Sequence, residues 1–452
     1  MRQSAFTIFT DVRDRAAAEA LRDLLDGYGD RIGSDESFPF GTFEDLHYAT
    51  FVAIPDVGGH PKLLFEGNVD GTAAAFLEKL VRRAPDAVDT IYRHCVDYPA
   101  AGAADVAAVV AYLRSHDVGA RTFFVAWPGF SVDDVHREQR LRDEIEAFLD
   151  APEQAGLRDL PPEEIHRRIR EHVGSNDTLR WAQSPPPSEF FVRYGPRLFT
   201  LLVAPLAVAL VGLLLGAIRR RPSRHRTRSR LGLAAVVTVV GGAVAELWSA
   251  ERGDDRRDLE RDWQSQYAVG IAALGAVRRR EDVQVQNHMI SVTRVKAGWF
   301  RLQVLRLVLW AINLFARLRA NRGSLGGIDS IHFARWVLTP DRKHLVFLSN
   351  FDGSWERYLN DFIDLAAIGL TAVWTNSDNH VGFPTTKWLL TKGARDEARF
   401  KAYARSSMVP SNTWYSAYPN LTVRNIENNR RLRQELCTTL DRPDAEAWLR
   451  RL

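Results

Sequence analysis

The sequence predicts an α+β protein in which two tandem ferredoxin-like modules form an intramolecular pseudo-dimer or barrel, with an apolar helical hairpin inserted between them. The first observation is internal similarity: residues 111–144 and 402–435 align without a gap and are identical at 13 of 34 positions, where average residue usage gives about two. The other observations are a matching order of strand and helix patterns, and an uncharged stretch between the copies. The repeat divides the 452 residues into modules at 1–150 and 287–452, joined by 151–286.

The first module opens with a β-rich run at 6–12 and a helical pattern over 16–25 that Gly27 is expected to end. Two short apolar runs follow, at 46–54 and 62–66. The bridge between them is rich in turn-forming residues, so the pair predicts a β-hairpin.

A helix to about Arg83 and a strand near 88–94 are expected after Asp70-Gly71. They complete the order β-α-β-β-α-β, which is typical of a ferredoxin-like unit. The remaining expected elements are a helix over 103–115, a strand over 122–127 and a long charged helix over 132–149.

An antiparallel sheet with helices on one face leaves its other face bare. Two copies in one chain can cover each other's bare faces, which is why we expect the modules to pair. Aromatic residues near the strands and strand ends are expected to line a cavity between the two sheets: Trp336, Trp374, Trp414 and Tyr415.

The middle of the chain predicts membrane attachment. Residues 198–218 are 21 positions without a charge, which as a helix span about 31 Å and match a hydrocarbon core of about 30 Å. A second, weaker apolar helix is expected at about 231–250, interrupted by Glu246. The two helices form a hairpin that either spans the bilayer or enters and leaves one leaflet.

Two features of the sequence disagree about which side of the membrane the globular modules occupy. The connector Arg219–Arg230 carries seven arginines, and the positive-inside tendency places it in the cytoplasm. Two full spans would then export both modules. Residues 1–10 lack the apolar core of a signal peptide, which favours a bacterial inner-membrane protein with its globular modules on the cytoplasmic side.

A further apolar stretch, Trp299–Leu318, mixes long apolar side chains with Arg and Trp. This composition is typical of a helix that lies in the membrane interface; burial against the hairpin is the alternative.

The charge distribution points to the same partner. Residues 1–150 hold 26 acidic and 15 basic side chains, whereas the rest of the chain holds 30 acidic and 45 basic ones. The basic excess surrounds the apolar segments, so Arg219–Arg230 is expected to meet anionic lipid headgroups, worth about 1 kcal/mol per cation, rather than nucleic acid. The two cysteines, Cys95 and Cys437, form neither a disulfide framework nor a C-x-x-C metal site.

Two pairs of repeat-equivalent residues are the candidate functional side chains. His47 and His332 start matching strands, and a histidine there is a possible haem ligand or acid-base group; a strand histidine hydrogen-bonded at a sheet edge is the alternative. Asp70 and Asp352 each follow a strand in an Asn-x-Asp-Gly sequence. The alternative for these aspartates is a local strand-to-helix turn with a helix cap.

Gly67-Asn68-Val69-Asp70-Gly71 resembles the G-x-x-D-G element of the dye-decolourising peroxidases, whose chains also pair two ferredoxin-like halves. The resemblance implies a haem cofactor with Asp70 and Asp352 as catalytic carboxylates and Arg335 as the distal cation. It implies His332 as the iron ligand, with His47 at the equivalent place in the first copy. The second copy lacks the first glycine of the motif, and His344 and His380 are the other histidines that could replace His332.

Runs at 331–336, 349–355 and 414–419 resemble a group of uncharacterised bacterial membrane-associated proteins. Two functions follow as expectations: a membrane-anchored haem-dependent oxidoreductase of peroxidase type, or a non-catalytic membrane-associated module that binds a lipid, an apolar ligand or a protein partner between its repeats. A third possibility, intermediate between these two functions, is a cofactor-free oxygenase built from the same two paired modules.

Overall fold

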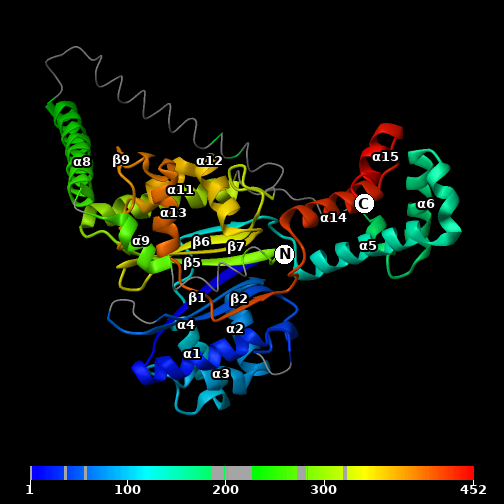
Figure 1. The fold of residues 1–452 in the computed structure, drawn as a ribbon, viewed down its shortest axis with the longest axis horizontal. Helices are drawn as coiled ribbons and strands as arrows, with labels where there is room; N and C mark the ends of the chain where they lie inside the picture. Colours follow the sequence, from blue (N-terminus) through cyan, green and yellow to red (C-terminus); the bar gives the residue numbers. More distant parts are fainter. Residues whose placement is uncertain are drawn as a thin grey trace.

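The structure is a computed structural model that describes residues 3–34, 38–54, 59–184, 227–259, 261–271, 281, 283–318 and 323–452, together with 198 and 201. The described chain is a mixed α+β protein with two main antiparallel sheets (Figure 1). The first sheet has the strand order β1-β3-β2-β11 and the second β4-β6-β7-β5-β8, and β9 and β10 form a small separate hairpin.

The strands have the following bounds: β1 (Gln3–Asp11), β2 (Leu46–Ile54), β3 (Lys62–Asp70), β4 (Thr122–Val125), β5 (Gln286–Val295), β6 (Ile331–Leu338), β7 (His344–Asp352), β8 (Ser377–Asp378), β9 (Thr386–Lys387), β10 (Thr391–Lys392) and β11 (Thr413–Ser416). The expected hairpin of the first module is confirmed as β2 and β3.

Each main sheet takes one strand from the other half of the chain, where the first half is residues 3–150 and the second half is 286–452. β11 of the second half pairs with β2, with Trp414 opposite Thr50. β4 of the first half pairs with β6, with Phe124 opposite Ala334. Because the exchange is reciprocal, the halves can separate only if both edge ladders break.

Four helices cover the outer face of the first sheet (Figure 1): α1 (Arg15–Asp30), α2 (Ala73–Arg83), α3 (Pro85–Tyr92) and α4 (Val106–Ser115). The prediction of a strand near 88–94 is wrong, because the chain forms the helix α3 there. Pro85 occupies the first turn of this helix and supplies the backbone angle that a helix start needs. The expected stop at Gly27 is also wrong. α1 continues because its last turn packs on the other half, where a Cβ on Gly29 would lie 1.9 Å from the Asn412 carbonyl oxygen.

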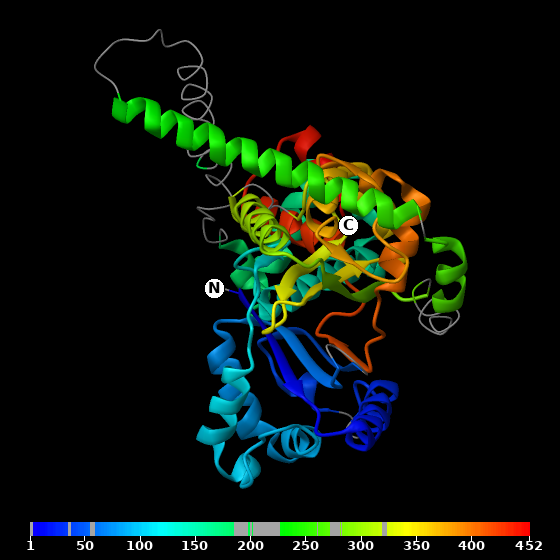
Figure 2. The same ribbon diagram turned by 90° about the vertical axis from the view of Figure 1, so that its left-hand side faces the viewer.

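The second half carries α11 (Trp299–Leu318), α12 (Trp355–Trp374) and α13 (Glu397–Ser406), preceded by α8 (Thr227–Leu259) and α9 (Trp263–Ile271). The helix expected over Trp299–Leu318 is confirmed with the same bounds. The helix expected at about 231–250 lies within α8, whose N-terminal end projects beyond the body (Figure 2). The helix expected over 198–218, apart from residues 198 and 201, and the connector up to residue 226 fall outside the described residues.

The bare faces of the two sheets pack directly on each other. Apolar side chains of both form one cluster: Phe9, Val52, Ile54 and Leu64 from the first sheet, and Ile290, Val337, Val346 and Leu348 from the second. The expected aromatic lining is wrong for Trp336 and Trp374, which contact each other in the core beneath α12. Tyr415 is partly buried and stacks on Phe40 at the core of the first half, but with Trp414 it also lines an open pocket between the two halves, as expected for these two residues. Strand alternation sends neighbouring side chains to opposite faces.

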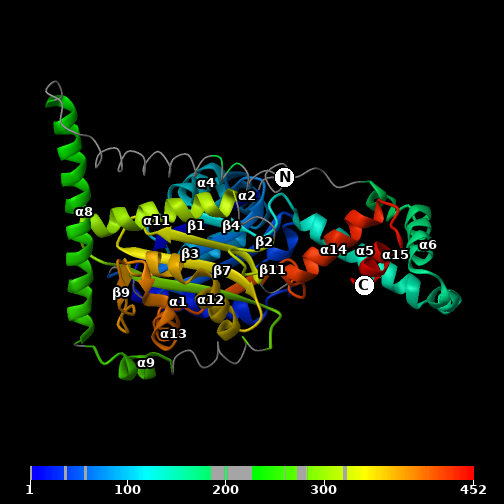
Figure 3. The same cartoon turned by 90° about the horizontal axis from the view of Figure 1, so that it is seen from above.

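An arm of helices extends from the sheets at the end of the molecule opposite α8 (Figures 1 and 3). It consists of α5 (Val132–Asp150), α6 (Pro162–Ser175), α14 (Val423–Leu436) and α15 (Arg442–Leu449). Its own apolar core includes Ile145, Ile169, Leu432 and Trp448. Short 3-10 turns occur at Phe40–Thr42, Gly102–Ala104, Pro152–Asp159, Arg180–Gln183 and Gly393–Arg395.

Candidate functional site

Asp70 and Asp352 each end a strand and hold the first residue of a distant helix. Asp70 Oδ2 accepts the backbone N–H of Val132 at 2.9 Å, where α5 begins. Asp352 Oδ2 accepts the backbone N–H of Val423 at 2.7 Å, where α14 begins. A carboxylate at a helix N-terminus satisfies an unpaired N–H and interacts favourably with the helix dipole. The two aspartates therefore attach the arm to the two sheets.

The local cap that was the alternative reading of Asp70 and Asp352 belongs to other residues. Thr72 caps α2 and Ser354 caps α12 through their side-chain oxygens. Gly71, with φ of +82°, turns the chain between Asp70 and Thr72, a conformation that glycine adopts without a Cβ clash. The aspartates are thereby left free to reach α5 and α14.

The other oxygen of each aspartate binds a buried histidine. His47 Nε2 lies 3.2 Å from Asp70 Oδ1, and His332 Nε2 lies 2.6 Å from Asp352 Oδ1. His47 Nδ1 is 2.8 Å from the hydroxyl of Tyr418. Burial raises the pKa of Tyr418, so its hydroxyl stays protonated and can donate to Nδ1. A carboxylate oxygen accepts, so the hydrogen bond between this pair runs from Nε2 of His47 to Asp70.

Arg335 belongs to a separate buried group between the sheets. Its guanidinium forms an ion pair with Glu66 and donates to Asn68 Oδ1 at 2.9 Å, so it is engaged by the facing sheet rather than by either aspartate. His288 Nε2 lies 3.1 Å from Glu66 Oε1. Burial lowers the pKa of Arg335 to about 9 and that of His288 to about 3. At neutral pH the imidazole of His288 is therefore neutral, while Arg335 keeps its positive charge opposite Glu66.

A small cavity joins the two histidine-aspartate pairs. His47 and His332 both line it, together with Tyr418 and Phe333, and its volume is about 20 Å³. A space of this size holds about one water molecule. The structure thus brings the predicted pairs together at one point, while Arg335 lies elsewhere.

The cavity does not fit a haem. Pockets for organic cofactors and ligands of that size occupy at least about 300 Å³, and the Nε2 atom of each histidine already faces a carboxylate. The alternative ligands lie apart: His344 begins β7 at the end opposite Asp352, and His380 is exposed. Across the described residues, no group of three or more His, Cys, Asp or Glu side chains could hold a metal ion.

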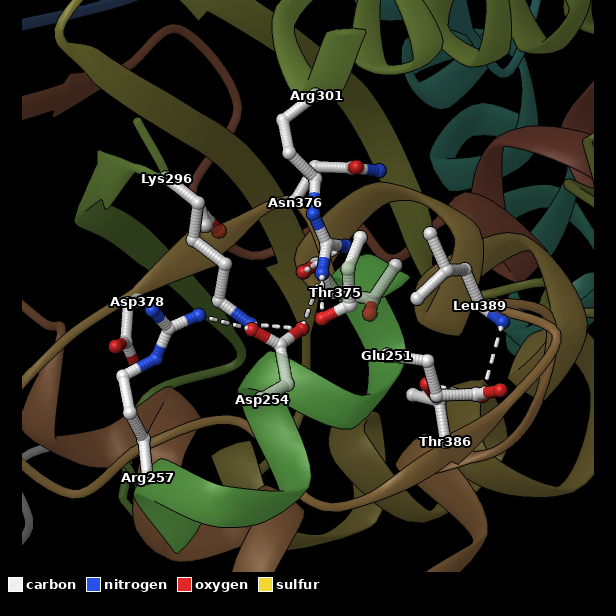
Figure 4. Close-up of polar contacts among 12 residues, drawn as sticks. Glu251, Asp254, Arg257, Lys296, Arg301, Thr375, Asn376, Asp378, Thr386 and Leu389 are labelled. Carbon is white, nitrogen blue, oxygen red and sulfur yellow. Dashed lines mark hydrogen bonds and ion pairs between the residues drawn. The ribbon is translucent and has the colours of Figure 1, made fainter. Parts of the chain in front are cut away.

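A second polar site binds α8 to the second half (Figure 4). We call this site, formed by Glu251, Asp254 and Asp258 of α8 and their partners, the clasp. Asp254 of α8 accepts from Lys296 Nζ at 2.8 Å and from Arg301 at 2.5 Å, and Arg301 also donates to the carbonyl of Ala250 at 3.0 Å. Burial lowers the pKa of Lys296, and the Asp254 carboxylate opposes that shift. One turn away, Glu251 accepts from Thr386 Oγ1 at 3.2 Å.

A third contact fixes the end of the same helix, where Asp258 pairs with Arg399. Sequence reasoning missed this clasp. The available signal was acidic residues at helical spacing directly after an apolar span, at 251, 254 and 258.

Exposed large apolar side chains gather around α8 and the outer helices of the second half. Nine of the fourteen on the described chain lie there: Val244 and Trp248 on α8, Trp299, Leu307 and Trp310 on α11, Leu365 and Ile368 on α12, and Trp388 and Leu390 at the turn between β9 and β10. Within the described residues, α11 is the one helix long and apolar enough to cross a membrane, and only 22% of its apolar window is buried. The described residues therefore bury one face of α11 and leave part of the helix exposed.

An open pocket of about 520 Å³ lies where the two sheets part. It is lined from both halves of the chain, with apolar side chains at Ile32, Val283, Val285, Trp414 and Tyr415. The chain matches no protein-family model, no curated protein and no solved structure.

Proposed function

We propose that the protein is a non-catalytic, membrane-attached module whose second half rests on a lipid bilayer. The observation that carries this proposal is the gathering of nine of the fourteen exposed large apolar side chains on α8, α11, α12 and the β9–β10 turn. Exposed large apolar side chains concentrated on a few neighbouring elements favour an interaction site over ordinary surface.

The outward face of α11 has the composition of an interfacial helix. Trp299, Leu307 and Trp310 are 76%, 64% and 61% exposed, and Arg306 and Arg317 are exposed on the same helix. Its opposite face buries Leu305 and Leu309 in the core. Trp and Leu side chains interspersed with arginine suit the boundary between headgroups and acyl chains.

The course of α8 supports the same arrangement. α8 is 33 residues long, about 50 Å as a helix, and its N-terminal part contains the apolar run at 231–245. Figure 3 shows α11 running across α8. If α8 follows the membrane normal, α11 lies along the membrane surface, as its composition requires. The sidedness we propose is the cytoplasmic face of a bacterial inner membrane.

We further propose that the two halves are duplicated ferredoxin-like units that exchanged their last strands. The strand orders β1-β3-β2 and β5-β7-β6 correspond. The helix caps by Asp70 and Asp352 correspond too. The haem-dependent peroxidase is the less favoured function, because the cavity beside His47 and His332 has room for about one water molecule.

A second candidate function is the binding of an apolar ligand in the 520 Å³ pocket between the halves. The exposure of Ile32, Val283 and Val285 at this pocket favours it, at 37%, 82% and 40%. Native mass spectrometry of the purified chain would show a co-purifying apolar compound, which Val283→Asp should displace. An unchanged spectrum in that variant would contradict this candidate.

The membrane proposal is tested with the full chain reconstituted into phospholipid vesicles. The protein should float with the vesicles at high salt. An environment-sensitive fluorophore on Leu307→Cys, in a Cys437→Ser background, should shift to the blue on reconstitution. The same label on Val96→Cys, an exposed apolar site of the first half, is the control and should not shift. A protein that stays in the dense fraction, or a label at 307 that behaves like the one at 96, would overturn the proposal.

A further inference from the structure

We propose that the turn Trp388–Leu390 inserts into the interface of an anionic bilayer and, with Trp248 and Trp299, forms an aromatic collar where α8 leaves the membrane. This inference rests on the proposed membrane attachment and names the surface that performs it. The collar is defined here as Trp248, Trp299 and the exposed turn residues Trp388 and Leu390; Leu389 between them is buried in the protein.

The chain segments that carry Trp299 and Trp388 contact α8 about one turn after Trp248. Trp248 belongs to α8 itself. Trp299 stands two residues before Arg301, which donates to the carbonyl of Ala250 at 3.0 Å. Trp388 precedes Leu389, whose backbone N–H donates to Glu251 at 3.4 Å. Figure 4 shows Arg301 and Leu389 reaching the helix from different elements.

All three tryptophans are nevertheless exposed. Trp248 is 50% exposed, Trp299 76% and Trp388 50%, and Leu390 beside Trp388 is 47% exposed. Tryptophan is enriched at both membrane-water interfaces, since its amphipathic ring suits the headgroup level. Three exposed tryptophans at one level of a helix that continues into an apolar run form such a belt.

The backbone around the β9–β10 turn adopts left-handed conformations that its residue types disfavour. Trp388 and Leu389 have φ of 59° and 55°, and Lys392 has φ of 62°. Left-handed backbone is uncommon for residues other than glycine, and for bulky side chains it marks strain. Strained backbone of this kind concentrates at functional positions. Leu389 is buried and packs in the protein, but Trp388 keeps a large, half-exposed side chain where glycine would fit better, which is expected if that side chain binds something.

The exposed charges around the collar are mainly positive. Lys387 and Lys392 flank the turn and are exposed, and the guanidinium of Arg252 lies 3.5 Å from the Trp248 ring. Glu251 and Asp254 point into the clasp and are bound there, and the half-buried Asp255 carboxylate offsets part of the charge of Lys392. Cations beside an apolar tip favour anionic headgroups.

Continuity of the chain favours a bilayer over a protein partner. From Trp248 towards its N-terminus, α8 runs through 231–247, in which Glu246 is the single charged residue. The apolar side chains of such a helix are buried favourably in the hydrocarbon core of a bilayer. The collar lies at the C-terminal end of this apolar run, which is where the membrane-water interface is expected.

The test uses the full chain with Cys437→Ser and a fluorophore on Leu390→Cys or, separately, on Trp388→Cys. Cys95 is buried and its burial raises its pKa to about 12, so it does not compete for the label. Vesicles of phosphatidylcholine and phosphatidylglycerol carry a spin label either near the headgroup or near the methyl end of the acyl chain. The headgroup-level quencher should quench both positions several-fold more than it quenches a control label on Val96→Cys, which is 38% exposed on the first half.

The label on Leu307→Cys separates this inference from the membrane proposal. If that label is quenched and the labels at 388 and 390 behave like the one at 96, the collar is wrong and membrane attachment stands. If the protein does not float with the vesicles, membrane attachment itself is wrong. Lys387→Gln with Lys392→Gln should at least halve the quenching at 390 in anionic vesicles and leave it unchanged in neutral ones. Equal quenching in both lipids would overturn the anionic preference.

Discussion

The carboxylate of Asp352 accepts the backbone N–H of Val423 at 2.7 Å across 71 positions of the chain, and its other oxygen binds His332 at 2.6 Å. One side chain thus joins the end of β7, the start of β6 and the start of α14. Asp70 repeats the arrangement with Val132 and His47. The arm is attached to each sheet through one carboxylate.

We expect Asp352→Ala to destabilise the fold by about 2–4 kcal/mol, because two charge-assisted hydrogen bonds are lost and a buried N–H is left unpaired. Asp70→Ala should cost a similar amount. Urea unfolding measures both. Asp364→Ala, on the exposed side of α12, is the control and should stay within about 0.5 kcal/mol of the wild type. A small effect of Asp352→Ala would show that the arm is attached mainly by other contacts.

The buried pair of Glu66 and Arg335 offers a test that the repeat itself suggests. Arg335→Thr alone should cost about 3–5 kcal/mol, since it leaves the Glu66 charge unpaired between the sheets. The residues at the repeat-equivalent positions are Leu348 for Glu66 and Thr50 for Arg335. The double variant Glu66→Leu with Arg335→Thr should therefore recover most of the loss in a denaturant titration. If the losses of the two single variants simply added in the double variant, Glu66 and Arg335 would not be energetically coupled, and the prediction would be wrong.

Stability should depend on pH through Glu138 of α5. Burial is the main cause that raises the pKa of this carboxyl to about 7, against an ordinary value of 4.5. Between these values the folded state binds more protons than the unfolded state, so stability falls as the pH rises through this window. The cost at and above pH 7 is on the order of 2–3 kcal/mol. Thermal unfolding of Glu138→Gln should show a flatter pH profile than the wild type, and parallel profiles would contradict the assignment.

Lys392→Gly should stabilise the chain in detergent by about 1 kcal/mol, because Lys392 has φ of 62° and ψ of −103°, which glycine adopts at lower cost. Lys387→Gly is the matched control, since Lys387 lies in β9 and has no such backbone angle. It should lower the melting temperature slightly. A lower melting temperature for Lys392→Gly would show that its side chain stabilises the turn.

Hemin added to the purified protein should give no stoichiometric Soret band, because the cavity beside His47 and His332 is about 20 Å³. Spectrophotometric titration measures this, with His332→Ala as the control. A stoichiometric band that disappears in His332→Ala would restore the peroxidase as the leading function.

Patterns within single elements predicted much of the fold. The hairpin of β2 and β3, the helix α5 and the helix α11 were all expected near their observed bounds, because apolar periodicity and caps are local properties. The region near 88–94 shows the limit. Val88, Ile91 and Tyr92 suit a strand as well as a helix, and Pro85 with its packing decides for the helix.

The sequence predicted which residues form the candidate site, but not which partners they bind. The repeat selected Asp70, Asp352, His47 and His332, and the structure joins them as two bonded pairs. The same reasoning placed Arg335 with them, although its partner is Glu66. Hydrogen bonds between residues 62 to 268 positions apart leave no trace in local composition.

The sequence by itself determined the α+β class, the internal repeat, and the apolar and basic character of the middle of the chain, since these depend on residue order and composition. Only the tertiary structure decided that β4 and β11 change sheets, that Asp70 and Asp352 hold the arm, and that Asp254 clasps α8. Strand exchange, remote caps and buried ion pairs depend on which surfaces meet. That choice is made by packing over the whole chain, and no short segment encodes it.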